Sequence, residues 1–193
     1  MTQKNYNMPL IEVIQPEQAQ GELKKVYDNL ISSRGKLAEV HKIQSLNPKS
    51  IVGHMDLYMT LLYGKSPIRR VYREMIAVVV SKANNCEYCQ KHHLEAVKHY
   101  WKNDAKANAF KNDFNKVELT DLERTLCTYA HEHTINPSTD KAPIINKLKN
   151  LGLNDRAILD ATLIIAYFNF VNRIVLGLKV ELESDNGKGY KFD

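Results

Sequence analysis

The sequence has few cysteines, no long apolar run and no block of like charges. Its three cysteines among 193 residues are too few for a disulfide-stapled scaffold and leave one unpaired. No apolar run exceeds six or seven residues, whereas a membrane-spanning helix needs about 20, so we expect no membrane association. The first residues lack the apolar core of a secretion signal, which predicts a cytoplasmic protein with reduced thiols.

The charge distribution argues against a nucleic-acid-binding function. There are 27 basic and 22 acidic residues, but the two kinds are interleaved and no basic block of five or more occurs. We therefore expect no nucleic-acid partner, and only a modest positive field that would attract an anionic substrate or an acidic protein. The eight glycines are too sparse for a GxGxxG turn, so no flavin, nicotinamide or other cofactor is predicted.

The remaining pattern predicts a single all-α domain over residues 1–193. With 44% hydrophobic and 25% charged residues, a chain of this length can bury a core of its own. Apolar residues recur at helical spacing, and no strand pair with hairpin signals appears. The core is expected over about residues 8–182, with a loose tail at 184–193. Helices are predicted over 17–33, 38–46, 48–63, 66–82, 86–101, 120–133, 140–150 and 154–182, although the apolar run at 75–80 also suits a buried strand.

The stretch from Glu74 to His93 contains the residues that predict chemistry. On one helix, Cys86, Cys89 and His93 are spaced by three and four residues, so all three project from the same face. Cys86 lies near the helix start, where free N–H groups favour a thiolate. His93 is placed to exchange a thiol proton. If the preceding helix packs back on this one, a buried Glu74 joins the group, and burial beside a thiolate would raise its pKa.

These residues also have simpler interpretations. Cys86, Cys89 and one of the adjacent His92 and His93 could form part of a zinc site, but no second CxxC supplies the remaining ligand. We expect Cys127 to be a small buried hydrophobe and His92 to lie at the surface. The larger aromatic residues are expected in the core rather than in a binding site: Tyr58, Tyr63, Tyr72, Tyr167, Phe168 and Phe170.

The pattern Glu74-x11-Cys86-x2-Cys89-x3-His93 resembles the signature of the alkylhydroperoxidase D-like proteins of the carboxymuconolactone decarboxylase superfamily, and most closely their peroxidase-related branch. The resemblance spans about residues 8–182. Besides that pattern, it rests on Pro9-Leu10-Ile11-Glu12, Gly21-Glu22-Leu23 with Val26-Tyr27, the segment from Arg73 to Ser81, Cys86-Glu87-Tyr88-Cys89, and Phe170-Val171-Asn172-Arg173.

The resemblance implies an all-helical fold that assembles into dimers, trimers or hexamers, and a thiol-dependent reduction of hydroperoxides. It implies that Cys89 attacks the peroxide, that Cys86 resolves the resulting sulfenic acid, and that Glu74 and His93 relay protons. The helix-dipole argument instead favours Cys86 as the more acidic thiol, so the order of the two sulfurs stays open. The family carries a histidine directly before its second cysteine, where this chain has Tyr88, a poor base near neutral pH.

Two functions follow as hypotheses. The first is a thiol peroxidase or disulfide oxidoreductase in antioxidant defence, with a hydroperoxide or disulfide substrate and an external thiol or lipoyl-type electron donor. The second is a non-catalytic, oligomeric redox sensor or stress-related binding protein that uses the same disulfide as a switch. The departure at Tyr88 makes general disulfide exchange a stronger alternative to peroxide reduction.

Overall fold

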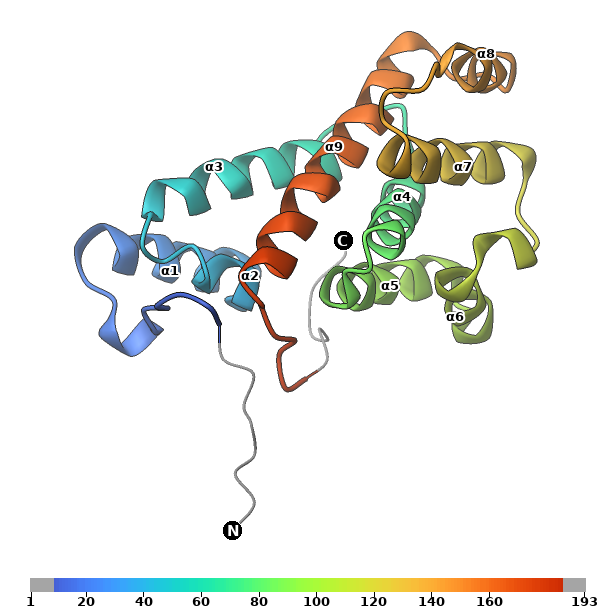
Figure 1. Ribbon diagram of the computed structural model, residues 1–193. Helices are drawn as coiled ribbons and strands as arrows, with labels where there is room; N and C mark the ends of the chain where they lie inside the picture. Colours follow the sequence, from blue (N-terminus) through green and yellow to red (C-terminus); the bar gives the residue numbers. More distant parts are fainter. Residues whose placement is uncertain (1–8, 186–193) are drawn as a thin grey trace.

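The computed structural model describes residues 9–185, so most of the predicted tail at 184–193 lies outside the described residues. Over that range the chain is helical and contains no strand, which confirms the all-α prediction (Figure 1). The α-helices are α1 (Gly21–Arg34), α2 (Glu39–Lys42), α3 (Pro48–Tyr58), α4 (Arg70–Ala83), α5 (Glu87–Trp101), α6 (Asp104–Asn112), α7 (Asp121–Ile135), α8 (Ala142–Asn150) and α9 (Asp155–Gly177). Short 3-10 turns occupy Pro16–Gln18 and Phe114–Lys116.

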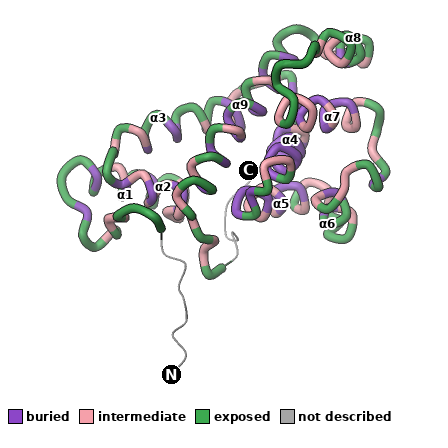
Figure 2. Tube along the Cα trace, viewed as in Figure 1, coloured by how far each residue is buried: buried purple, intermediate pink, exposed green. Residues whose placement is uncertain are grey.

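Helix α4 forms the centre of the molecule. It packs against α5, α7 and α9, and all its residues from Arg73 to Ser81 are buried (Figure 2). The apolar run at 75–80 is therefore a helix buried on all sides rather than a strand. Figure 1 shows α1, α2 and α3 on one side of the long helix α9 and α4 to α7 on the other.

The start of α4 differs from the sequence prediction. The Ser66-Pro67 pair was expected to begin the helix, but α4 begins at Arg70. The Ser66 hydroxyl donates to Asp160 Oδ2 at 2.5 Å and accepts from the Ile68 amide, so it anchors the loop to α9 instead of capping α4. The predicted break at the other end is confirmed: Asn85 adopts a left-handed φ of 57°, and the next helix starts directly after Cys86.

A π-helical segment, Met59–Tyr63, continues α3 and ends where Gly64 is required. A Cβ on Gly64 would lie 2.3 Å from the Thr60 carbonyl oxygen, which no side chain tolerates. The buried Arg73 of α4 holds this turn by donating to the carbonyl oxygens of Leu61, Leu62 and Gly64. The turn thereby fixes the end of α3 against the helix that carries Glu74.

Helix α9 is shorter than predicted, and the side of it that faces the core is not entirely the predicted one. It ends at Gly177 rather than near residue 182, because Lys179 adopts a left-handed φ of 53° and reverses the chain. Phe170 was expected in the core but is exposed, while Tyr167 and Phe168 are buried as predicted. Helix α6 was not predicted, because its sequence has few apolar residues.

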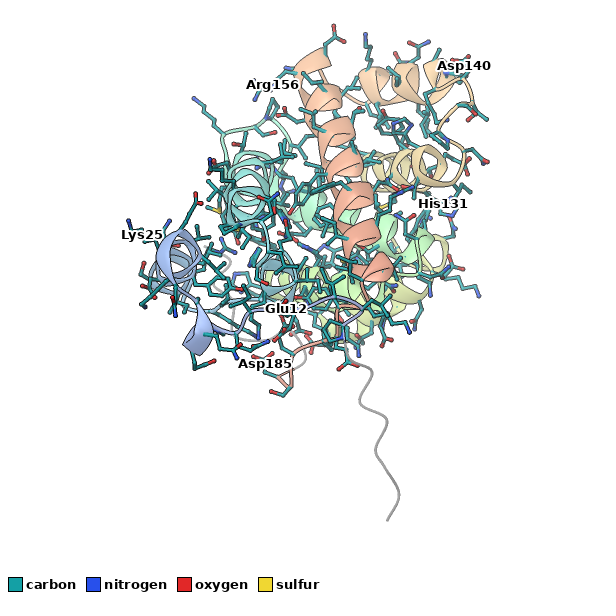
Figure 3. All side chains as sticks on the ribbon, turned by 60° about the vertical axis from the view of Figure 1, so that its left-hand side comes forward. Glu12, Lys25, His131, Asp140, Arg156 and Asp185 are labelled. Carbon is teal, nitrogen blue, oxygen red and sulfur yellow. The ribbon has the colours of Figure 1, made fainter. Side chains whose placement is uncertain are left out.

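Helix α9 is also long and apolar enough to cross a membrane by length and composition. In the folded protein, 56% of its most apolar window is buried against other helices, as in a core helix. Charged side chains of both signs surround the molecule, among them Lys25, Asp140 and Arg156 (Figure 3).

Candidate active site

The two cysteines of the CxxC pair lie next to each other at the start of α5. Cys86 is the N-cap of the helix and Cys89 lies in its first turn. Their Sγ atoms share a hydrogen bond 3.0 Å long, and both thiols are free. A disulfide is about 2.0 Å long, so the pair can form one by approaching about 1 Å. The predicted convergence of these sulfurs is confirmed.

The two thiols differ in acidity. Their shared hydrogen bond is the main cause: it lowers the pKa of Cys86 and, together with burial, raises the pKa of Cys89. A hydrogen bond with the Cys89 backbone further lowers the pKa of Cys86. A hydrogen bond from the buried Asn172 opposes the rise at Cys89. Cys86 is therefore the more acidic of the two thiols and Cys89 the less acidic, in the direction that the dipole argument predicted.

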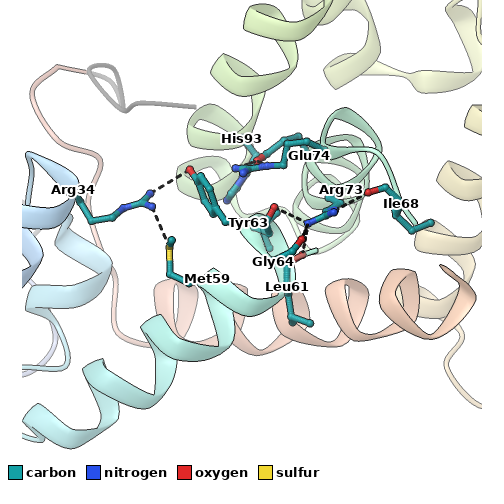
Figure 4. A network of polar contacts seen from close by, with 11 residues as sticks. Arg34, Met59, Leu61, Tyr63, Gly64, Ile68, Arg73, Glu74 and His93 are labelled. Atoms are coloured by element: carbon teal, nitrogen blue, oxygen red, sulfur yellow. Dashed lines mark hydrogen bonds and ion pairs between the residues drawn. The ribbon is translucent and has the colours of Figure 1, made fainter. Parts of the chain in front are cut away.

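Glu74 and His93 form the predicted pair across α4 and α5, but with a third member. Glu74 and His93 lie side by side in Figure 4, with Glu74 Oε2 2.6 Å from His93 Nδ1. Glu74 Oε1 accepts from Arg70 Nε and Nη2 at 2.8 and 2.6 Å. Burial alone would raise the pKa of Glu74, but the charges and hydrogen bonds of His93 and Arg70 lower it below its ordinary value. The expectation that Glu74 holds a proton is therefore wrong. The sequence reasoning missed Arg70, although its position four residues before Glu74 on a helix is a signal for an ion pair.

A cavity of about 80 Å³ connects these groups. Cys89, Glu74 and His93 line it, whereas Cys86 does not. Since Nδ1 of His93 is held by Glu74, its Nε2 is the ring atom left for a molecule in the cavity. Cys127 lies elsewhere, fully buried as predicted, and burial raises the pKa of its thiol. Cys89 is thus the sulfur that a substrate in the cavity can meet.

Several aromatic residues that were expected in the core also line this cavity. They come from α3, the π-helical segment and α9: Tyr58, Tyr63, Tyr167 and Phe168. Tyr88 of α5 lines it as well. The sequence could not show this, because a residue that packs on a cavity wall and one in a solid core have the same helical spacing.

Tyr88 and His92 are joined to the segment after α9. The Tyr88 hydroxyl donates to Glu183 Oε1 at 2.7 Å and accepts from the Val40 amide, and its ring stacks on His92 at 4.2 Å. His92 Nε2 lies 3.0 Å from Glu183 Oε2. The expectation that His92 is a surface residue is wrong, because its side chain is only 12% exposed and lines the cavity. Tyr88 therefore serves as an anchor for a wall of the cavity.

Removal of the Glu183 carboxylate is expected to destabilise the protein in a pH-dependent way. Burial raises the pKa of Glu183, but His92, the Glu39 amide and Tyr88 lower it to about 2. A carboxylate with a lowered pKa stabilises the fold above its unfolded pKa of about 4.3, and this contribution is lost as the pH falls toward 2. Glu183→Gln should lower the free energy of unfolding by on the order of 2–3 kcal/mol at pH 7.

This prediction is checked by denaturant titration of both proteins between pH 2 and pH 8. The difference between wild type and Glu183→Gln should be constant above about pH 5 and shrink below pH 4. Glu87→Gln is a matched control, since Glu87 pairs with Lys91 on the same helix but is 77% exposed, and it should have no measurable effect. A Glu183 effect that does not depend on pH would contradict the assigned charge.

A second chain of hydrogen bonds ends at the cavity wall. Gln44 Nε2 donates to the Val40 carbonyl oxygen at 2.7 Å, which fixes the orientation of the amide, and the same nitrogen lies 2.8 Å from His54 Nδ1. His54 Nδ1 must therefore accept, and its Nε2 carries the proton and donates to the Tyr167 hydroxyl at 2.7 Å. Burial lowers the pKa of His54 to about 4 and raises that of Tyr167, so both stay neutral near pH 7. The Tyr167 O–H is left as a donor for another partner.

One of the comparisons with known proteins covers the segment that carries this site. Residues 53–109 match the model of the carboxymuconolactone decarboxylase family, and this segment contains Glu74, Cys86, Cys89 and His93. No curated protein matches the chain. Together with the structural likenesses below, this match confirms the resemblance to the alkylhydroperoxidase D-like proteins of that superfamily.

The fold is found in several solved structures. A peroxidase-related protein from Silicibacter sp. TM1040 is 23% identical, with a TM-score of 0.80 over 94% of this chain and 92% of the other. A protein from Ralstonia eutropha JMP134, described as an alkylhydroperoxidase AhpD core, is 18% identical, with a TM-score of 0.83 over 93% and 94%. The debrominase Bmp8 is 21% identical, with a TM-score of 0.76 over 92% and 94%. The same architecture therefore supports more than one chemistry, and the function must be argued from the site.

Proposed function

We propose that the protein is a thiol-dependent hydroperoxide reductase that cycles Cys86 and Cys89 between dithiol and disulfide. The observation that carries this proposal is the pair of sulfurs 3.0 Å apart, of which Cys89 alone lines a cavity shared with Glu74 and His93. The family resemblance supports the same chemistry.

The first half of the cycle consumes the hydroperoxide. The Cys89 proton passes along the shared hydrogen bond to the Cys86 thiolate, which makes Cys89 the nucleophile. The Cys89 thiolate attacks the terminal oxygen of ROOH, the O–O bond breaks, and Cys89 becomes a sulfenic acid while RO⁻ leaves. RO⁻ takes a proton from His93 and departs as the alcohol. The sulfur loses two electrons and the peroxide gains them.

The second half restores the thiols. The Cys86 sulfur attacks the Cys89 sulfenic acid, water leaves, and the disulfide forms. An external dithiol, such as a lipoyl-type donor, then attacks Cys89 from the cavity. Cys86 is the leaving group, and its lowered pKa favours that role. The donor becomes a disulfide and gives up two protons, of which Cys89 takes one and His93 the other, while Cys86 returns to the thiolate.

Arg70 and Glu74 prepare His93 for this proton transfer. The Glu74 carboxylate accepts a hydrogen bond from His93 Nδ1, which fixes the ring and leaves its Nε2 for the substrate. Arg70 keeps Glu74 ionised inside the protein, because its guanidinium balances the buried negative charge. In this account Glu74 acts as an anion that orients His93 rather than as a proton carrier.

A redox sensor that does not turn over is the second candidate. The observation that favours it is the burial of both sulfurs, with 0% of Cys86 and 2% of Cys89 exposed. Such burial slows the approach of a protein-bound donor. A sensor would be oxidised once by hydroperoxide and would stay oxidised with every small dithiol.

Self-association is part of the proposal. Helix α9 exposes Leu159, Leu163, Ala166 and Phe170, which are spaced by four, three and four residues and lie on one face. An apolar stripe of this kind packs on a second copy of itself in many oligomers. Light scattering behind a sizing column measures the subunit number.

The experiment that tests the proposal is a screen of hydroperoxides against thiol donors, with consumption of hydroperoxide as the readout. We expect catalytic consumption with a dithiol donor and little with a monothiol, because a single thiol leaves a mixed disulfide. One equivalent of oxidation without turnover would support the sensor. Unchanged hydroperoxide and fully reduced Cys86 and Cys89 would exclude both functions.

A further inference from the structure

Arg34 is a positively charged residue on the wall of the cavity. It is the last residue of α1, and its guanidinium lies over the rings of Tyr58 and Tyr63 at 5.3 and 5.0 Å. Its polar contacts are weak ones, 3.3 Å to the thioether Sδ of Met59, which is a poor acceptor, and 3.4 Å to the Tyr63 hydroxyl (Figure 4). Within residues 9–185 no aspartate or glutamate pairs with it. Most of its five N–H donors are therefore available to a ligand.

The other charged side chains on the cavity wall each pair with a residue of opposite charge. Glu74 is the carboxylate among the residues that line the cavity, and it is held by Arg70 and His93. Lys36 pairs with Asp185. Arg34 therefore leaves the cavity with excess positive charge, in a place where the aromatic walls screen charge less than water does.

Two further polar groups on the cavity wall each lack one hydrogen-bond partner among the described residues. The Tyr167 O–H has no acceptor among the described residues, as its hydroxyl oxygen already accepts from His54. Nδ1 of His41 is buried and has no hydrogen-bond partner in the part of the chain that the structure describes. Burial together with the charges of His54 and Arg34 lowers the pKa of this histidine to about 3, so it stays neutral. Buried polar groups in native proteins are nearly always paired, and a ligand or water that pairs these two must occupy the cavity.

We propose that the cavity binds an organic hydroperoxide that carries a carboxylate, with the carboxylate on Arg34 and the O–O bond at Cys89. A guanidinium suits this task because its planar fork matches the two oxygens of a carboxylate. The aromatic residues between Arg34 and Cys89 would contact the apolar part of the substrate. This inference rests on the proposed function, to which it adds the substrate class.

The test compares two hydroperoxides that differ only in charge: cumene hydroperoxide with a para-carboxylate, and the methyl ester of the same compound. For the wild type we expect a lower KM for the carboxylate. Arg34→Gln should raise the KM for the carboxylate roughly 10–50-fold, the size of one lost charge-assisted contact, and change that for the ester less than about threefold. Arg34→Lys keeps the positive charge but loses the planar guanidinium, so its KM for the carboxylate should lie between those of the wild type and Arg34→Gln. Arg69→Gln is the matched control, since Arg69 also stacks on a tyrosine, Tyr72, but does not line the cavity.

A binding measurement separates this inference from the proposed function. Calorimetry with 4-isopropylbenzoate, which carries the carboxylate but no peroxide, should show binding to the wild type and about 10-fold or weaker binding to Arg34→Gln. If the benzoate binds through Arg34 but neither hydroperoxide is reduced, the anion site stands and the proposed function fails. If both hydroperoxides are reduced with equal kcat/KM and Arg34→Gln changes neither, the peroxidase stands and the carboxylate site is overturned.

Discussion

Replacement of Cys89 by serine is expected to reduce hydroperoxide consumption by at least about 10³-fold, to near the uncatalysed rate. Cys89 is the sulfur that lines the cavity, and a serine hydroxyl is not ionised near neutral pH. The measurement is the steady-state rate of hydroperoxide loss with a dithiol donor. Full activity in Cys89→Ser would remove Cys89 from the mechanism.

Two other cysteine variants make this result specific. Cys86→Ser retains the attacking sulfur but loses its proton acceptor and its resolving partner, so it should form the Cys89 sulfenic acid slowly, once, and without turnover. Cys127→Ala should retain activity, because Cys127 is fully buried and lines no part of the cavity. Equal loss in all three variants would indicate a folding defect rather than a role in chemistry.

Glu74→Gln is expected to give the largest loss of stability. Glu74 is 1% exposed and neutralises Arg70, so the variant leaves a guanidinium without its counter-charge. Breaking a buried ion pair in this way costs about 3–5 kcal/mol. For a chain of this size the loss corresponds to a Tm lower by roughly 6–20 °C. Calorimetry measures the Tm, and kcat, measured well below that temperature, should fall about 10²-fold because His93 loses its orienting partner.

The pH dependence and a double variant distinguish the loss of the Glu74 charge from a change in side-chain packing. A carboxylate with a lowered pKa stabilises the fold above its unfolded pKa, so the loss in Glu74→Gln should be constant from pH 5 to pH 8 and shrink below about pH 4.3. Adding Arg70→Met removes the unpaired charge and should restore part of the Tm, but not the activity. Glu95→Gln, which breaks the more exposed pair with Lys98, is the control. An unchanged Tm in Glu74→Gln would contradict the buried ion pair.

The sequence contained most of the information that places the thiols and the acid–base pair. The spacing of Cys86, Cys89 and His93 puts them on one helix face, and the Asn84-Asn85 break turns α5 back onto α4. The resemblance supplied the partnership of Glu74 with His93, which the structure confirms at 2.6 Å. These are local or nearly local relationships, which is why periodicity and turn residues can predict them.

The remaining features depend on contacts between distant segments. Ser66 was predicted to cap α4, but its hydroxyl donates a hydrogen bond to Asp160, which lies 94 residues further along the chain. Similarly, Tyr88 and His92 are held by Glu183, and His54 by Tyr167, through contacts that no local pattern reveals. The ionisation of Glu74 was mispredicted for the same reason, because burial was considered without the neighbouring Arg70.

The most direct test of the account is to treat the reduced protein with one equivalent of hydroperoxide and to map its thiols by mass spectrometry. Trypsin cleavage after Lys82 and Lys91 places Cys86 and Cys89 in one peptide and Cys127 in another. The account predicts that the first peptide becomes lighter by two hydrogen atoms and that the Cys127 thiol stays free. If Cys86 and Cys89 both remain free thiols while the hydroperoxide is consumed, or if either pairs with Cys127, the dithiol–disulfide cycle is wrong.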